Sequence, residues 1–134
     1  MRESCRKHLE DILWDYGRKV DAYLKRREQI KGFLHPGGYE AKVSGGSPDF
    51  EGERYVEMLN SDKQLASIYR YIAPINKAIA KLPYHQRQII ELRYVMGMEQ
   101  EDVMKELDIT LASYYREKRK AFNAIGWSVF GVYC

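Results

Sequence analysis

The sequence predicts an all-α protein in which a long N-terminal helix and a glycine-rich loop precede a helical bundle that ends in a helix-turn-helix. Apolar residues recur in steps of three and four along most of the chain, which is the spacing of one face of an α-helix. The stretch 35–48 interrupts them with four glycines and two prolines, a composition typical of a loop. Near the C-terminus two helical patterns are joined by only Asp108-Ile109-Thr110, as in a helix-turn-helix.

Length and composition indicate one soluble globular unit. The chain has 134 residues, of which 45% are hydrophobic and 31% charged, and its net charge of +3 neither demands nor excludes nucleic acid. No stretch has the length of a transmembrane helix and the charged start lacks an apolar signal-peptide core, so we expect a cytoplasmic protein with no membrane partner. We divide the chain into an N-terminal helix (1–34), a Gly/Pro-rich loop (35–48), connecting helices (49–82) and a helix-turn-helix DNA-binding domain with an apolar tail (83–134).

Residues 3–34 are predicted to form one long amphipathic helix. Its apolar stripe follows alternating steps of four and three residues: Leu9, Leu13, Tyr16, Val20, Tyr23, Arg27, Ile30 and Leu34. The stripe has three interpretations, namely packing on the chain's own core, self-association as an oligomerisation arm, or contact with DNA or a membrane. Gly17 should weaken the helix by about 1 kcal/mol relative to alanine.

The connecting helices carry a regular apolar stripe that is typical of a core face. Its members are Leu65, Ile68, Ile72, Ile75, Ile79 and Leu82. Pro74 lies inside this stripe, so we expect a kink or break at 71–73. Pro83 should end that helix and start the next one, over 84–95, since proline suits a first helical turn.

The helix-turn-helix is predicted from local turn chemistry. Val103 and Leu107 lie four residues apart and share the inner face of a short first helix. Asp108 falls where the chain must turn sharply, and aspartate tolerates a left-handed backbone better than most residues. Thr110 is a good N-cap for the second helix because its hydroxyl can accept a free backbone N–H.

The second helix has a buried face and a basic exposed face. Tyr114, the stem of Lys118, Ala121 and Ile125 recur at helical spacing and should be buried. The residues predicted to lie outside are Leu111, Ala112, Ser113, Tyr115, Arg116, Arg119 and Lys120. The first helix is acidic and the second is basic, so a polyanion should be drawn to the second, although an ordinary solvated helical hairpin would show the same pattern.

The apolar C-terminal tail is relevant to whether the protein forms oligomers. The tail 126–134 is nearly uncharged and aromatic, so we expect it to fold back on the bundle or to pack against a second subunit. Together with the stripe of the N-terminal helix, it predicts a homo-oligomer. The two cysteines, Cys5 and Cys134, are expected to be free thiols.

No residue pattern indicates catalysis. The three histidines are scattered, no serine or cysteine lies in a nucleophile motif, and the glycine-rich loop lacks the spacing of a phosphate-binding loop. Cys5 and His8 are one helical turn apart, but two ligands do not make a metal site. We therefore expect a protein that is not an enzyme and that holds no metal and no cofactor.

The segment LPYHQRQIIELRYVMGMEQEDVMKELDITLASYYREKRKAF resembles the promoter-binding C-terminal domain of bacterial sigma factors. The resemblance includes Leu92-Arg93-Tyr94 at the end of a helix, the glycine turn at Gly97, and the helix-turn-helix. Two positions depart from the usual pattern, since Met104 replaces a small alanine and Asp108 replaces a common glycine.

More narrowly, YYREKRKA (114–121) resembles the RinA/ArpU family of phage late-gene regulators, as do YLKRREQI (23–30), VSGGSP (43–48), LNSDKQL (59–65) and RQIIELRY (87–94). This resemblance implies a transcriptional activator that binds double-stranded DNA upstream of late genes, including packaging genes, in a bacterial host, with RNA polymerase as a further candidate partner. Two alternatives stay open: a phage DNA-packaging recognition subunit, and an interaction protein that docks on RNA polymerase without binding DNA.

The helix-turn-helix assigns roles to the exposed residues. Arg116 is the first candidate for a base contact, because a guanidinium can bond O6 and N7 of guanine together. Ser113 could contact a base or a phosphate, and Leu111 or Ala112 a thymine methyl group. Arg119 and Lys120 lie farther along the helix and are expected to bind phosphate. Arg87 and Arg93, on the preceding helix, either contact the DNA backbone or form surface salt bridges.

Overall fold

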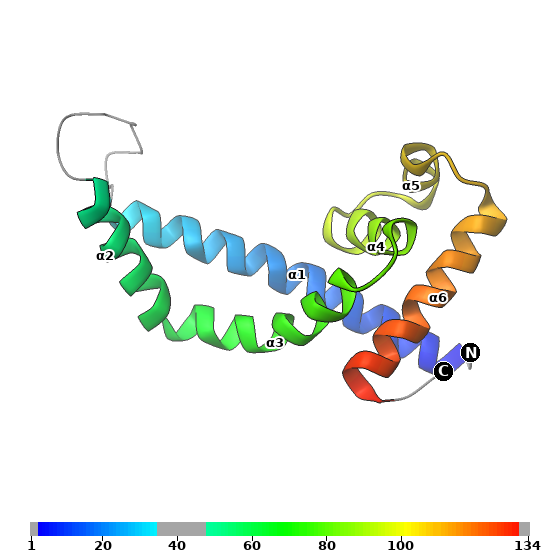
Figure 1. The fold of residues 1–134 in the computed structure, drawn as a ribbon, viewed down its shortest axis with the longest axis horizontal. Coiled ribbons are helices and arrows are strands. Elements are labelled where there is room, and N and C mark those ends of the chain that lie inside the picture. The colour runs from blue at the N-terminus through cyan, green and yellow to red at the C-terminus, as the bar shows by residue number, and fades with distance from the viewer. Residues whose placement is uncertain (1–2, 35–47, 132–134) are drawn as a thin grey trace.

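The computed structural model describes residues 3–34 and 48–131, and every regular element in these ranges is helical, which confirms the predicted all-α fold. The elements are α1 (Glu3–Leu34), α2 (Pro48–Ser61), α3 (Lys63–Ala80), α4 (Tyr84–Ile90), the π-helical turn η1 (Glu91–Val95), α5 (Gln100–Leu107) and α6 (Leu111–Phe130). The molecule is elongated, with α2 at one end and α4, α5 and α6 gathered at the other (Figure 1). The loop at 35–47 lies outside the described residues.

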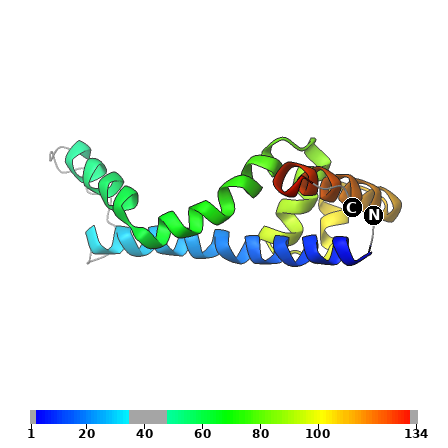
Figure 2. The same ribbon diagram turned by 90° about the horizontal axis from the view of Figure 1, so that it is seen from below.

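Helix α1 runs along the molecule, and α3 and α6 lie on the same side of it (Figure 2). Its stripe is buried at Leu9, Leu13, Tyr16 and Ile30, and Val20 and Tyr23 pack against the same core. The side chain of Leu34 lies outside the described ones. Of the three interpretations of this stripe, packing on the chain's own core is therefore what the structure shows.

Gly17 has a packing role that the sequence did not reveal. A Cβ atom at this position would lie 2.0 Å from the carbonyl oxygen of Tyr94. The missing side chain lets the backbone of α1 lie directly against the backbone of η1. The predicted weakening of the helix is thus accompanied by a close contact that only glycine permits.

Helix α3 begins at a well-made cap and continues through its proline. Asp62 accepts the backbone N–H of Leu65 at 2.9 Å and pairs with Arg26 of α1 at 2.7 Å, which joins the two helices. Of the predicted kink or break near 71–73, a break is wrong, since α3 is one helix from Lys63 to Ala80. Pro74 lies on the exposed face of α3, where water can bond the carbonyl that lacks its usual partner.

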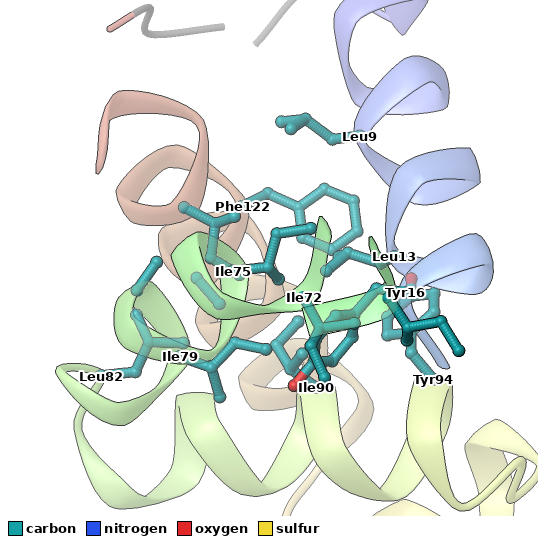
Figure 3. Close-up of a cluster of buried hydrophobic side chains, with 14 residues drawn as sticks. Leu9, Leu13, Tyr16, Ile72, Ile75, Ile79, Leu82, Ile90, Tyr94 and Phe122 are labelled. Carbon is teal, nitrogen blue, oxygen red and sulfur yellow. The ribbon is translucent and has the colours of Figure 1, made fainter. Parts of the chain in front are cut away.

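The core joins α1 to the C-terminal helices. The predicted stripe over 65–82 is buried at all six positions. Its members from Ile68 onward pack in one cluster with Leu9, Leu13 and Tyr16 of α1 and with Phe122 of α6. Figure 3 shows these side chains converging from the three helices. Since residues 3–34 supply part of this core, the packing argues against a separable N-terminal arm.

The tail differs from the expectation. Helix α6 continues to Phe130, so residues 126–130 are the last turns of this helix rather than a segment that folds back on the bundle. Val129 packs against the core, whereas Trp127 and Phe130 are about half exposed. Gly131 caps the helix with a φ of 69°, and residues 132–134 lie outside the described ones.

The prediction of free thiols is wrong for Cys5, which is disulfide-bonded. The same prediction for Cys134 falls on a residue outside the described ones.

Candidate nucleic-acid interface

The turn between α5 and α6 has the geometry that its residues predict. Asp108 adopts a left-handed backbone with φ 52° and ψ 52°. The backbone N–H of Ile109 donates to the carbonyl of Met104 at 3.1 Å, which closes the end of α5. The Thr110 hydroxyl accepts the backbone N–H of Ser113 at 3.1 Å, which confirms the predicted N-cap of α6.

A small second core sets the angle between the two helices. Ile89 of α4, Val103 of α5 and Tyr114 of α6 are fully buried against one another. Met104 packs against this cluster as a partly buried side chain, and its flexible thioether fills the place where a smaller residue is usual. Ile109, the middle residue of the turn, packs there as well.

The first ten residues of α6 carry the predicted exposed face. Leu111 is 50% exposed and Tyr115 46% exposed. The other exposed members are Ala112, Arg116, Arg119 and Lys120, and Ser113 is partly buried. The Tyr115 hydroxyl donates to Gln100 Oε1 at 3.2 Å, so it connects α6 to the start of α5.

Two of the three basic residues of this face, Arg116 and Lys120, meet at one carboxylate. Glu117 Oε1 lies 3.6 Å from Arg116 Nε and 3.8 Å from Lys120 Nζ. The other oxygen of Glu117 accepts Gln86 Nε2 at 3.0 Å, and this hydrogen bond is the main reason that the pKa of Glu117 lies below its usual value. Arg116 also donates from Nη2 to the Ser113 hydroxyl at 3.2 Å.

Residues 72–125 match the family model of Sigma-70, region 4. The match begins in the second half of α3 and ends near the last buried residue of α6, so it spans α5, the turn and most of α6. It confirms a sigma-like helix-turn-helix and supports a DNA-binding, transcription-related function for this part of the chain. No curated protein matches the chain significantly, and no solved structure does.

The two arginines before the sigma-like helix-turn-helix differ in their surroundings. Arg93 donates from Nη1 to the carbonyl of Met98 at 2.8 Å, and its guanidinium lies 4.8 Å from the ring centre of Trp14. It therefore braces the turn at Gly97, whose φ is 73°, against α1. Arg87 is partly buried on α4. A phosphate contact by either residue stays a prediction.

Lys118 connects α6 to α1 instead of facing outward. Its ammonium lies 3.4 Å from Glu10 Oε1, which also accepts the Tyr94 hydroxyl at 2.9 Å. The ammonium is within 6 Å of the rings of Tyr94, Tyr114 and Phe122, an arrangement that favours a cation. The predicted burial of the Lys118 stem is confirmed, and burial together with Glu10 raises the pKa of Tyr94.

Glu117 and Gln86 belong to the site but were not among its predicted residues. Glu117 carried a signal, since it is the single acidic residue of α6. Gln86 carried none, because only the packing of α4 on α6 shows that this amide is buried, at 8% exposure. Within the described residues no cluster of ligands could hold a metal ion, and none of their helices is long and apolar enough to cross a membrane.

Proposed function

We propose that this protein is a sequence-specific DNA-binding transcriptional activator of phage late genes, with α6 as the helix that enters the major groove. The observation that carries the proposal is the exposed basic face of α6 directly after a well-formed helix-turn-helix turn. In such proteins the N-terminal residues of the second helix contact base edges. The match of residues 72–125 to region 4 of Sigma-70 supports a DNA-binding, transcription-related function.

Distance along α6 divides the roles of its residues. Leu111, Ala112 and Ser113 form the first turn and would meet bases or a thymine methyl group. Arg116, one turn later, would bond guanine, for which a guanidinium has the matching pair of donors. Arg119 and Lys120 would bind phosphate, which positions the protein without selecting a sequence.

The two helices of the helix-turn-helix differ in the charge of their exposed side chains. On α5 the exposed side chains include Glu101, Asp102 and Glu106, against Lys105. The exposed charges of α6 are Arg116, Arg119 and Lys120. DNA would therefore be attracted to the face of α6 and repelled by that of α5, which favours one way of docking.

We propose that the DNA target of this protein lies upstream of phage late genes. Activation of late genes, including packaging genes, rests on the resemblance of 114–121 and the upstream segments to the RinA/ArpU regulators. On this proposal the protein works in the bacterial cytoplasm, on DNA upstream of a late operon, and RNA polymerase is a second partner.

Selection of bound duplexes from a random pool tests this function. The full chain should enrich one motif, and the variant Arg116→Ala/Arg119→Ala/Lys120→Ala should enrich none. In the phage genome the motif should occur upstream of late genes. A motif that occurs only inside a packaging gene would instead support a packaging recognition subunit, and no enrichment by the parent would support a protein that docks on RNA polymerase without binding DNA.

We also propose that the protein acts as a homo-oligomer. Trp127 and Phe130 are half exposed at the end of α6, and Leu24 and Phe33 are exposed on α1, so apolar side chains remain on the surface of the single chain. Measurement of the solution mass at tens of micromolar should give a dimer or larger. A monomer mass would contradict this part of the proposal.

A further inference from the structure

The carboxylate of Glu117 lies among the cations that the proposed function assigns to DNA. It is the single acid of α6, and one of its oxygens lies 3.6 Å from Arg116 Nε and 3.8 Å from Lys120 Nζ. An acid beside a phosphate-binding face opposes DNA binding through charge repulsion. Its presence there calls for a compensating role.

The position of the Glu117 carboxylate is fixed by a hydrogen bond from α4. Gln86 is 8% exposed on α4, and its amide donates to Glu117 Oε2 at 3.0 Å across the packed surface of the two helices. The Glu117 side chain itself is 20% exposed. Because one oxygen is held by a buried group of another helix, the second oxygen points at Arg116 from a defined place.

Arg116 is held at two of its nitrogens and open at the rest. A guanidinium has five N–H groups. Nε faces Glu117, and Nη2 donates one hydrogen to the Ser113 hydroxyl at 3.2 Å. Both hydrogens of Nη1 and one of Nη2 are left, which is the pair of nitrogens that can bond O6 and N7 of guanine side by side.

We propose that Glu117, anchored by Gln86, is a positioning residue that fixes the guanidinium of Arg116 for a two-bond contact with one guanine and thereby sets the sequence preference of α6. The proposal rests on the proposed function, because it needs α6 to contact bases. A long arginine side chain loses rotamer freedom when it binds, so holding it in place beforehand favours the correct base. The same charge lowers the attraction of the face for phosphate, so random DNA binds less tightly.

Glu117→Gln is the sharpest test, because glutamine keeps the size of the side chain and an oxygen that can accept from Gln86, but removes the charge. We expect the preference for guanine at the base pair that Arg116 selects to fall by at least about threefold, the size of coupling usual for contacting residues. Affinity for a scrambled duplex should rise. Glu106→Gln is the matched control, since it makes the same charge change at an exposed position of α5 and should leave the guanine preference unchanged.

Glu117→Asp separates position from charge. It keeps the negative charge but withdraws the carboxylate by one methylene group, so it should lower the guanine preference without raising the affinity for scrambled DNA. This variant also serves if Glu117→Gln lowers the melting temperature too far for binding to be measured. A purely structural role would change the melting temperature of both variants and leave the guanine preference intact.

The double variant Arg116→Ala/Glu117→Gln completes the test. Once Arg116 is absent, removal of the Glu117 charge should cause no further loss of preference at that base pair. Replacing the selected guanine with 7-deazaguanine, which lacks N7, should likewise remove the effect of Glu117→Gln. If the parent selects guanine through Arg116 and Glu117→Gln and Glu117→Asp both keep that preference, the inference is overturned while the proposed function stands. If the parent selects no sequence, the proposed function itself fails.

Discussion

At the scale of single residues, Gly17 lets α1 lie directly against η1 because it has no side chain. Its backbone lies so close to that of Tyr94 that an added Cβ would be 2.0 Å from the carbonyl oxygen. The obstacle is backbone, so it cannot rotate away as a long side chain could. Gly32 lies in the same helix and has nothing within 4 Å of an added Cβ, so the helix supplies its own control.

Gly17→Ala should lower the free energy of unfolding by at least about 2 kcal/mol, because α1 must move away from η1 to make room. Gly32→Ala should raise it by about 0.5 kcal/mol, since alanine restricts the unfolded chain and fits a helix. Urea unfolding of both variants and the parent measures the two changes. Equal effects of the two substitutions would show that the close contact at Gly17 does not exist in solution.

At the scale of elements, Asp62 acts at the junction of two helices. It caps the first turn of α3 through Leu65 and receives the guanidinium of Arg26 from α1 at 2.7 Å. The hydrogen bond from Arg26 is the main cause that holds the pKa of Asp62 below its usual value, followed by the backbone N–H of Leu65. The carboxylate must therefore be ionised for both helices to be held.

Asp62→Ala should lower the melting temperature more than Asp62→Asn, because asparagine still caps the helix but cannot pair with Arg26. The pKa of Asp62 is lowered on folding, so its contribution to stability is present above the ordinary aspartate pKa and is lost as the pH falls through the lower, folded value. Thermal unfolding between pH 7 and pH 2 should thus show that the difference between parent and Asp62→Asn shrinks on acidification. A difference that stays constant with pH would contradict this assignment.

At the scale of the whole molecule, the sequence predicts those features that depend only on residues close together in the chain. The stripe of α3, the left-handed turn at Asp108 and the cap at Thr110 depend on residues within a few positions of one another. Packing between distant segments could not be predicted in this way. Gln86 bonds Glu117 across 31 positions and Lys118 meets Glu10 across 108, and no periodicity encodes such pairs.

The same distinction explains why the sequence left three interpretations of the N-terminal helix open. The apolar stripe of α1 has the spacing of a coiled-coil interface, but in the folded chain it packs against α3 and α6. Glu10 then places a carboxylate beside Lys118 and Tyr94, so α1 braces the helix that carries the candidate interface. The arrangement makes the candidate interface depend on the whole molecule and not on the C-terminal segment alone.

The central claim, that α6 contacts bases through Arg116 and phosphates through Lys120, is tested most directly by a salt titration of affinity on the selected duplex and on a scrambled one. Arg116→Ala should cost roughly 1–3 kcal/mol on the selected duplex and little on the scrambled one. Lys120→Ala should weaken both alike and lower the salt slope by about one unit. If Arg116→Ala binds the selected duplex as tightly as the parent, the account of the candidate interface is contradicted.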